Sequence, residues 1–112
     1  MRHYKIALLE GDGIGPEIMK EAVKVLKLVE KRNDVKFELT TADFGASAYF
    51  KCGDPFPEET KAICDRADAI IKGPIGLSHE ESKKIPVDKQ PERGALLPLR
   101  ARFNTYANYR PV

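Results

Sequence analysis

A glycine-rich turn between a short apolar run and a long amphipathic segment constrains the fold of this chain more than any other feature. Ile6–Leu9 is continuously apolar, as in a strand of a parallel sheet that is covered on both faces. Gly11, Gly13 and Gly15 follow, and Pro16 suits the first turn of a helix. The order strand, glycine turn, helix is typical of α/β proteins.

The segment after Pro16 predicts a helix that continues to Asn33. Its apolar residues recur at spacings of three and four, which places them on one face of a helix. The face expected to be buried consists of Ile18, Ala22, Val25, Leu26 and Val29.

Further along the chain, strand and helix patterns continue to alternate. Strands are expected at 35–40, 69–71 and 104–110, helices near 46–50, 57–67 and 96–103, and a long polar loop at 77–93. We expect the strands at 6–9 and 69–71 to be buried and parallel, with the glycine turn and Gly73–Gly76 at the same end of the sheet. The predicted fold class is therefore α/β, with a mostly parallel sheet flanked by helices.

The glycine turn does not match the common nucleotide-binding motifs. The dinucleotide fingerprint needs a third glycine where this chain has Pro16, and no Gly-Lys-Ser/Thr follows, so it is not a P-loop either. Read alone, the glycines serve either a tight strand-to-helix turn or an anion at the helix N-terminus. Asp12 most simply caps or shapes the turn.

Composition excludes several classes of protein. The 112 residues carry 19 basic and 17 acidic side chains, a formal charge of +2, which gives no footprint for nucleic acid. No apolar run is long enough to span a bilayer. Two cysteines do not form a disulfide framework or a metal-binding pair, so we expect a reducing, cytoplasmic location.

The last twenty residues are basic and suggest a carboxylate site. Arg93 to Val112 contains four arginines and no acidic residue, so Arg100 and Arg110 lack an obvious local partner. Guanidinium groups hold carboxylates through paired hydrogen bonds, and two of them suit a dicarboxylate. From the residues alone, a pair of solvated surface arginines remains the alternative.

Three segments together resemble one enzyme family. The string from Glu10 to Ile18, Glu-Gly-Asp-Gly-Ile-Gly-Pro-Glu-Ile, resembles the opening signature of the isocitrate and isopropylmalate dehydrogenases, which are β-hydroxyacid oxidative decarboxylases. Residues 90–100 (QPERGALLPLR) and 106–111 (YANYRP) resemble the isopropylmalate branch. The resemblance implies an isocitrate/isopropylmalate dehydrogenase-like fold, with residues 1–112 as the N-terminal part of an incomplete first, cofactor-binding domain.

The resemblance also implies an activity and a set of site residues. The family reaction is an oxidative decarboxylation of a 2-hydroxy dicarboxylate with NAD and a divalent metal, Mg²⁺ or Mn²⁺, in a homodimer. By position in the motifs, Arg100 and Arg110 would bind substrate carboxylates and Leu96 the alkyl group of 3-isopropylmalate. Cofactor contacts would come from the residues at the matching positions: Ile14, Gly73, Pro74, Ile75, Gly76 and Glu92. The metal ligands and the catalytic acid and base are expected outside these residues.

Alternatives remain on both substrate and class. The family's glycine-rich stretch with Lys-Trp is replaced here by Leu77-Ser78-His79-Glu80-Glu81, so isocitrate, homoisocitrate and tartrate stay open as substrates. A non-catalytic α/β module is the alternative of a different class. We expect the chain by itself to lack activity, because the family's metal-binding and proton-transfer residues are absent from it.

Overall fold

A three-stranded parallel sheet forms the centre of the computed structural model, which describes residues 1–112. The strands β1 (Arg2–Leu9), β2 (Val35–Ala42) and β3 (Ala69–Lys72) lie in the order β2-β1-β3, and β1 is parallel to both neighbours. β1 begins earlier than the apolar run because its pairing with β2 starts at Arg2, opposite Val35. The predicted α/β class with a parallel sheet is confirmed.

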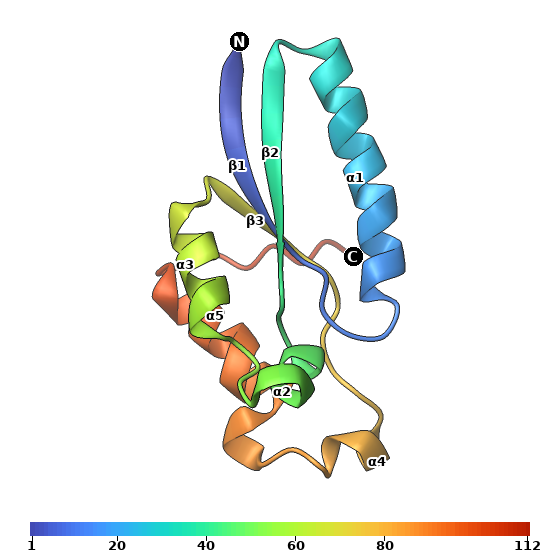
Figure 1. Ribbon diagram of the computed structural model, residues 1–112, viewed down its shortest axis with the longest axis vertical. Helices are drawn as coiled ribbons and strands as arrows, with labels where there is room; N and C mark the ends of the chain where they lie inside the picture. Colours follow the sequence, from blue (N-terminus) through green and yellow to red (C-terminus); the bar gives the residue numbers. More distant parts are fainter.

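Helices join the strands and cover both faces of the sheet. α1 (Gly15–Arg32) connects β1 to β2, and α2 (Ala46–Cys52) and α3 (Glu58–Arg66) connect β2 to β3. After β3 the chain forms α4 (His79–Ser82), a 3₁₀ turn (Val87–Lys89), a π-helical turn (Glu92–Leu96) and α5 (Leu97–Arg102). Figure 1 shows α1 on one side of the strands and α3 with α5 on the other.

Successive side chains of β1 point to opposite faces of the sheet and contribute to two separate hydrophobic cores. Ile6 and Leu8 face α1 and pack with the buried Met19. Ala7 and Leu9 point to the opposite face, as successive residues of a strand must. The core on that face is formed by buried residues from the loops and helices around it: Phe44, Phe56, Cys64, Ala95 and Leu99.

The predicted buried face of α1 is only partly right. Met19 is buried, and Ala22 and Val23 pack beside it. Ile18, Val25 and Val29 are 46%, 61% and 37% exposed. The apolar arc of the helix is wider than the strip of sheet beneath it, so its outer part remains in solvent.

The C-terminal segment differs most from the prediction. Residues 104–112 form no strand and are exposed, although their sequence alternates. A strand needs a paired neighbour for its N–H and C=O groups, and none pairs with this segment in the β2-β1-β3 sheet. Asn104 has a φ of 49°, and the chain leaves α5 there.

Two smaller expectations also change. The loop at 77–93 contains the short helix α4, whose N-cap Ser78 accepts a hydrogen bond from the Glu81 N–H. β3 is half-buried rather than buried, because it lies at the edge of the sheet. The predicted helices near 46–50, 57–67 and 96–103 are confirmed as α2, α3 and α5 with the turn before it.

Candidate functional site at the carboxyl ends of the strands

The glycine turn and the loop after β3 meet at one end of the sheet. The Asp12 N–H donates to Pro74 O at 2.8 Å, and the Gly73 N–H donates to Leu9 O at 2.7 Å. The predicted parallel arrangement of the two strands, with both loops at the same end, is therefore confirmed. This is the edge at which open α/β sheets bind ligands.

Two of the three glycines of the turn, Gly11 and Gly15, are required by close contact with backbone oxygens. A Cβ added to Gly11 would collide with Pro74 O, and one added to Gly15 or Gly73 would collide with Glu10 O. Gly13 has open space around it and needs only its positive φ of 59°. Of the two sequence interpretations of these glycines, the tight strand-to-helix turn accounts for them without a bound anion.

Asp12 accepts hydrogen bonds from three backbone N–H groups in two other segments. Its Oδ2 accepts from Ala46 N at 2.9 Å and from Gly76 N at 2.8 Å, and its Oδ1 accepts from Ser47 N at 2.7 Å. The side chain is buried, with 5% of the residue exposed. The Asp12 carboxylate was expected to cap or shape its own turn, but all three of its hydrogen bonds reach the start of α2 and the loop after β3 instead.

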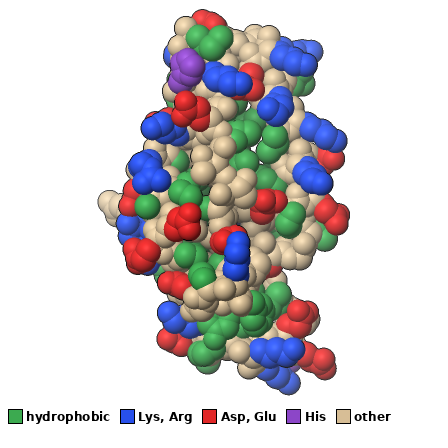
Figure 2. Space-filling view, viewed as in Figure 1, with side chains coloured by type: hydrophobic (Ala, Val, Ile, Leu, Met, Phe, Trp, Pro, Cys, Tyr) green, Lys and Arg blue, Asp and Glu red, His purple; other side chains and the backbone are tan.

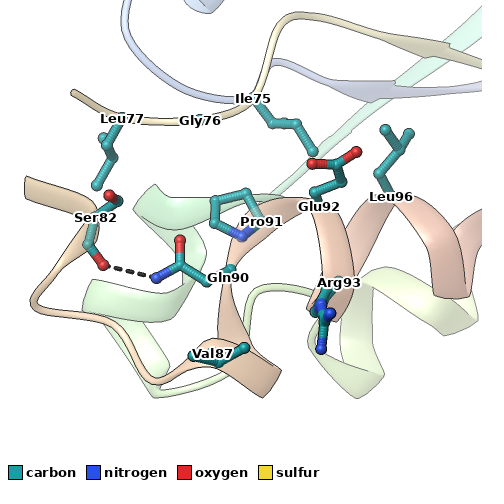
Figure 3. A pocket seen from close by; sticks show the side chains of 10 residues that line it. All are labelled: Ile75, Gly76, Leu77, Ser82, Val87, Gln90, Pro91, Glu92, Arg93 and Leu96. Carbon is teal, nitrogen blue, oxygen red and sulfur yellow. Dashed lines mark hydrogen bonds between the residues drawn. The ribbon is translucent and has the colours of Figure 1, made fainter. Parts of the chain in front are cut away.

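A pocket of about 450 Å³ opens beside the loop after β3. Figure 3 shows the side chains of Ile75, Glu92 and Leu96 directed toward one another, while Arg93 points away from them. Gln90 holds the segment from Ser82 to Ile85 in place at the pocket, because its Nε2 donates to Ser82 O at 2.7 Å and to Ile85 O at 2.8 Å. The ten lining residues are Ile75, Gly76, Leu77, Ser82, Val87, Gln90, Pro91, Glu92, Arg93 and Leu96.

The structure therefore brings four of the predicted site residues together. Ile75 and Gly76 come from the loop after β3, and Glu92 and Leu96 come from the π-helical turn before α5. Glu92 forms no ion pair, so its carboxylate is free to accept hydrogen bonds in the pocket.

The two arginines lie elsewhere. Arg100 lines a second hollow of about 410 Å³ with residues from the end of α5 and the segment after it. Arg110 lies in the exposed C-terminal segment and lines neither hollow. In this structure the arginines do not bracket one pocket.

The remaining predicted residues flank the loops. Ile14 is 61% exposed at the start of α1 and does not line the pocket. Gly73 is buried against Glu10, and Pro74 is exposed. The predicted cofactor contacts thus lie in two places, one at Ile14 and one at Gly76 and its neighbours.

Lys72 is a charged residue of this edge that the sequence analysis did not single out. Its Nζ donates to Gly73 O at 2.8 Å. Partial burial lowers the pKa of its ammonium group, the nearby Arg100 lowers it further, and Asp12 opposes both. A lysine that ends an otherwise apolar strand is the signal that could have identified it.

The described residues hold no group of three or more His, Cys, Asp or Glu side chains that could bind a metal ion. None of the helices has the length and apolar character needed to cross a membrane.

A parallel sheet whose loops converge at its carboxyl edge places this chain among the open α/β proteins, a class that binds its ligands at that edge. The profile of the isocitrate/isopropylmalate dehydrogenase family matches residues 5–112. The chain therefore belongs to this family, as its three sequence segments predicted.

Individual relatives agree with this assignment. The chain is 54% identical over 109 residues to the 3-isopropylmalate dehydrogenase of Geobacter sulfurreducens, covering 97% of this chain and 30% of that protein. It is 48% identical over 112 residues to the 3-isopropylmalate dehydrogenase of Haemophilus influenzae, covering 100% of this chain and 31% of that protein. The chain thus spans about 30% of the length of these curated relatives.

Solved structures show the same fold. The apo β-decarboxylating dehydrogenase of Thermococcus kodakarensis superposes with a TM-score of 0.66 at 33% identity, covering 90% of this chain and 27% of that one. The isocitrate dehydrogenase of Methylococcus capsulatus gives a TM-score of 0.58 at 34% identity, covering 68% of this chain and 21% of that one.

Proposed function

We propose that this chain is the N-terminal part of the first, cofactor-binding domain of an NAD-dependent enzyme that oxidatively decarboxylates 3-isopropylmalate, a step of leucine biosynthesis. The proposal rests mainly on the position of Leu96, which lines the pocket beside the loop after β3. Arg100 lies one turn further along the same helical segment. The relatives named 3-isopropylmalate dehydrogenase support the choice of substrate. We propose a cytoplasmic homodimer for the complete enzyme.

The substrate end of the site needs one apolar and two cationic contacts. Leu96 would contact the isopropyl group, because an apolar side chain suits an alkyl substituent. The same side chain would leave the third carboxylate of a tricarboxylate substrate without a partner. Arg100 would orient and neutralise one malate carboxylate through paired hydrogen bonds. Arg110 would bind the other, which requires its segment to fold toward Arg100 when the substrate is bound.

The pocket fits part of a dinucleotide. A cavity of about 450 Å³ lies within the usual size of small-ligand sites. Ile75 and Leu96 provide apolar walls, and Glu92 provides a free acceptor for an amide or a hydroxyl group. Ile75 and Glu92, with Gly73, Pro74 and Gly76, would hold the nicotinamide side of NAD, and Ile14 the adenosine side. When bound, NAD would supply the hydride acceptor needed to oxidise the hydroxyl-bearing carbon of the substrate.

The divalent metal of the proposed reaction does not fit this chain alone. The described residues lack a cluster of metal ligands. We therefore propose that this chain binds and orients the substrate and the cofactor. We assign it no role in metal binding or in proton transfer. The 112 residues alone should not reduce NAD in the presence of 3-isopropylmalate, even at high protein concentration.

Another substrate of the same family is the second candidate. The likeness to the isocitrate dehydrogenase of Methylococcus capsulatus favours it, as does the segment from Leu77 to Glu81, which departs from the isopropylmalate pattern. The apolar Leu96 in the pocket favours an alkyl-bearing substrate over a tricarboxylate.

The test is a substrate panel on the full-length protein that carries this segment. NADH formation would be measured with 3-isopropylmalate, isocitrate, homoisocitrate and tartrate, each with NAD and with NADP. We expect 3-isopropylmalate with NAD to give the highest kcat/KM, by about tenfold or more, since one pocket contact separates similar substrates by about 1–3 kcal/mol. The highest kcat/KM for isocitrate would establish the second candidate instead.

A further inference from the structure

One buried carboxylate ties together three segments of the site. Asp12 lies in the glycine turn, and its two oxygens accept hydrogen bonds from Ala46, Ser47 and Gly76. The three donor–acceptor distances are between 2.7 and 2.9 Å. Hydrogen bonds to a charged acceptor are among the stronger ones in proteins, so this group fixes the spacing of the segments it joins.

Two of these segments carry the two proposed ends of the cofactor site. Ile14 is two residues beyond Asp12 and exposed at the start of α1. Gly76 donates directly to Asp12 and lines the pocket with Ile75 and Glu92. Asp12 itself is buried and does not line the pocket. It connects the two segments, because it is in the same turn as Ile14 and its side chain accepts the hydrogen bond from Gly76.

We propose that Asp12 is a positioning residue that sets the distance between the adenosine-side and nicotinamide-side contacts of the dinucleotide. The inference rests on the proposed function, because it assumes a ligand that contacts both places. A ligand with two linked ends gains affinity only when both sites stand at the spacing that its linker spans. Each half of the ligand binds its own site without that requirement.

Asp12→Asn removes part of this connection at nearly constant shape. An amide has one acceptor oxygen where the carboxylate has two, and its NH₂ group faces a backbone N–H donor on the other side. If the oxygen stays with Ala46 and Gly76, the Ser47 contact is lost; if the amide turns, the contacts to Ala46 and Gly76 are lost. In either orientation the glycine turn and its neighbours are no longer joined at three points.

The experiment compares whole and divided ligands on the full-length protein. Dissociation constants for NAD, AMP and nicotinamide mononucleotide would be measured by calorimetry for the wild type and Asp12→Asn. The matched control is Asp68→Asn, because Asp68 also accepts a backbone hydrogen bond, from Lys5 N at 2.8 Å, at the opposite end of β3. We expect the Kd of NAD to rise about tenfold or more in Asp12→Asn, while the two fragments change by less than about threefold.

Three results would overturn the proposal. Unchanged NAD affinity in Asp12→Asn overturns it while leaving the proposed function intact. An equal loss for NAD and one fragment means that the variant only distorts one subsite. A wild-type protein that does not bind NAD defeats the proposed function, and this proposal with it.

Hydrogen exchange on the wild type tests the proposal without relying on the variant's folding. The amides of Ala46, Ser47 and Gly76 should exchange at similar rates, and NAD should slow all three. Ala46 and Ser47 do not line the pocket, so their protection would report the connection through Asp12. Protection of Gly76 alone would contradict it.

Discussion

Arg102 of α5 and Asp65 of α3 form a two-point ion pair. Arg102 Nε donates to Asp65 Oδ1 at 2.9 Å, and Arg102 Nη2 donates to Asp65 Oδ2 at 2.6 Å. The pair joins the helix before β3 to the helix that carries Arg100. It is the only ion pair between helices, and it fixes α5 against the sheet through α3.

This pair predicts a pH dependence of stability. The hydrogen bonds from Arg102 lower the pKa of the Asp65 carboxyl, despite some opposing desolvation. A lowered folded-state pKa contributes stability that is fully present above the ordinary aspartate value of about 3.9 and is lost as pH falls through the lowered value. Asp65→Asn should therefore lower Tm at pH 7, and the difference from wild type should shrink at acidic pH. Thermal unfolding followed by circular dichroism at a series of pH values measures it; a difference that does not change with pH would contradict the assignment.

We expect alanine at Gly11 to lower the free energy of unfolding more than alanine at the nearby Gly13. Both have positive φ, so alanine at either position is strained by about 1–2 kcal/mol. At Gly11 the new Cβ also collides with Pro74 O and disturbs the hydrogen bond from the Asp12 N–H to that oxygen. Gly11→Ala should therefore lose at least about 1 kcal/mol more than Gly13→Ala. Urea unfolding of both variants checks this, and equal losses would mean that the two loops do not need their close contact.

From the exposed apolar flank of α1 we expect the 112-residue chain to self-associate. Ile18, Val25 and Val29 are exposed side by side along this helix. Basic side chains line the outer edge of α1, with hydrophobic side chains between it and the strands (Figure 2). Sedimentation equilibrium should show association, and a double variant, Ile18→Gln with Val25→Gln, should reduce it.

Lys20→Gln is the control for that experiment, because Lys20 is an exposed polar residue of the same helix. A wild-type chain that sediments as a stable monomer would contradict the prediction.

We expect Leu96 to set the preference of the enzyme for an alkyl-bearing substrate. In the full-length protein, Leu96→Ala should lower kcat/KM for 3-isopropylmalate relative to malate, because the lost apolar contact affects only the alkyl-bearing substrate. The expected change in the ratio is about tenfold, from the 1–3 kcal/mol that such contacts contribute. An unchanged ratio would place the alkyl group elsewhere.

Several elements of the fold can be predicted from the sequence because their local pattern is strong enough to determine their structure. The run Ile6–Leu9, the glycine turn and the helix to Arg32 each carry a strong local signal, and the structure contains all three. Residues 104–110 show why alternation is insufficient. A strand exists only where a neighbour supplies hydrogen bonds, and that information lies outside the segment.

The sequence predicts that the two loops meet at one end of the sheet, but not which residues of the site contact one another. The spacing of Asp12 from Gly76 gives no sign that they bond, because the contact depends on how two parallel strands align their ends. Lys72 was overlooked for the same reason, since its proximity to Arg100 arises only after α5 packs back on the sheet. The exposed flank of α1 was missed because periodicity gives the width of an apolar arc and not the width of the surface that covers it.

Arg100 and Arg110 are proposed to bind the substrate's carboxylates. The measurement is kcat/KM for 3-isopropylmalate in full-length Arg100→Lys and Arg110→Lys, with Arg32→Lys at the end of α1 as control. A lysine keeps the charge and loses the paired hydrogen bonds, so each site variant should lose about tenfold or more, equivalent to about 1.4 kcal/mol. The control should match the wild type. Wild-type kinetics in both site variants would show that these arginines are surface residues and that the substrate binds elsewhere.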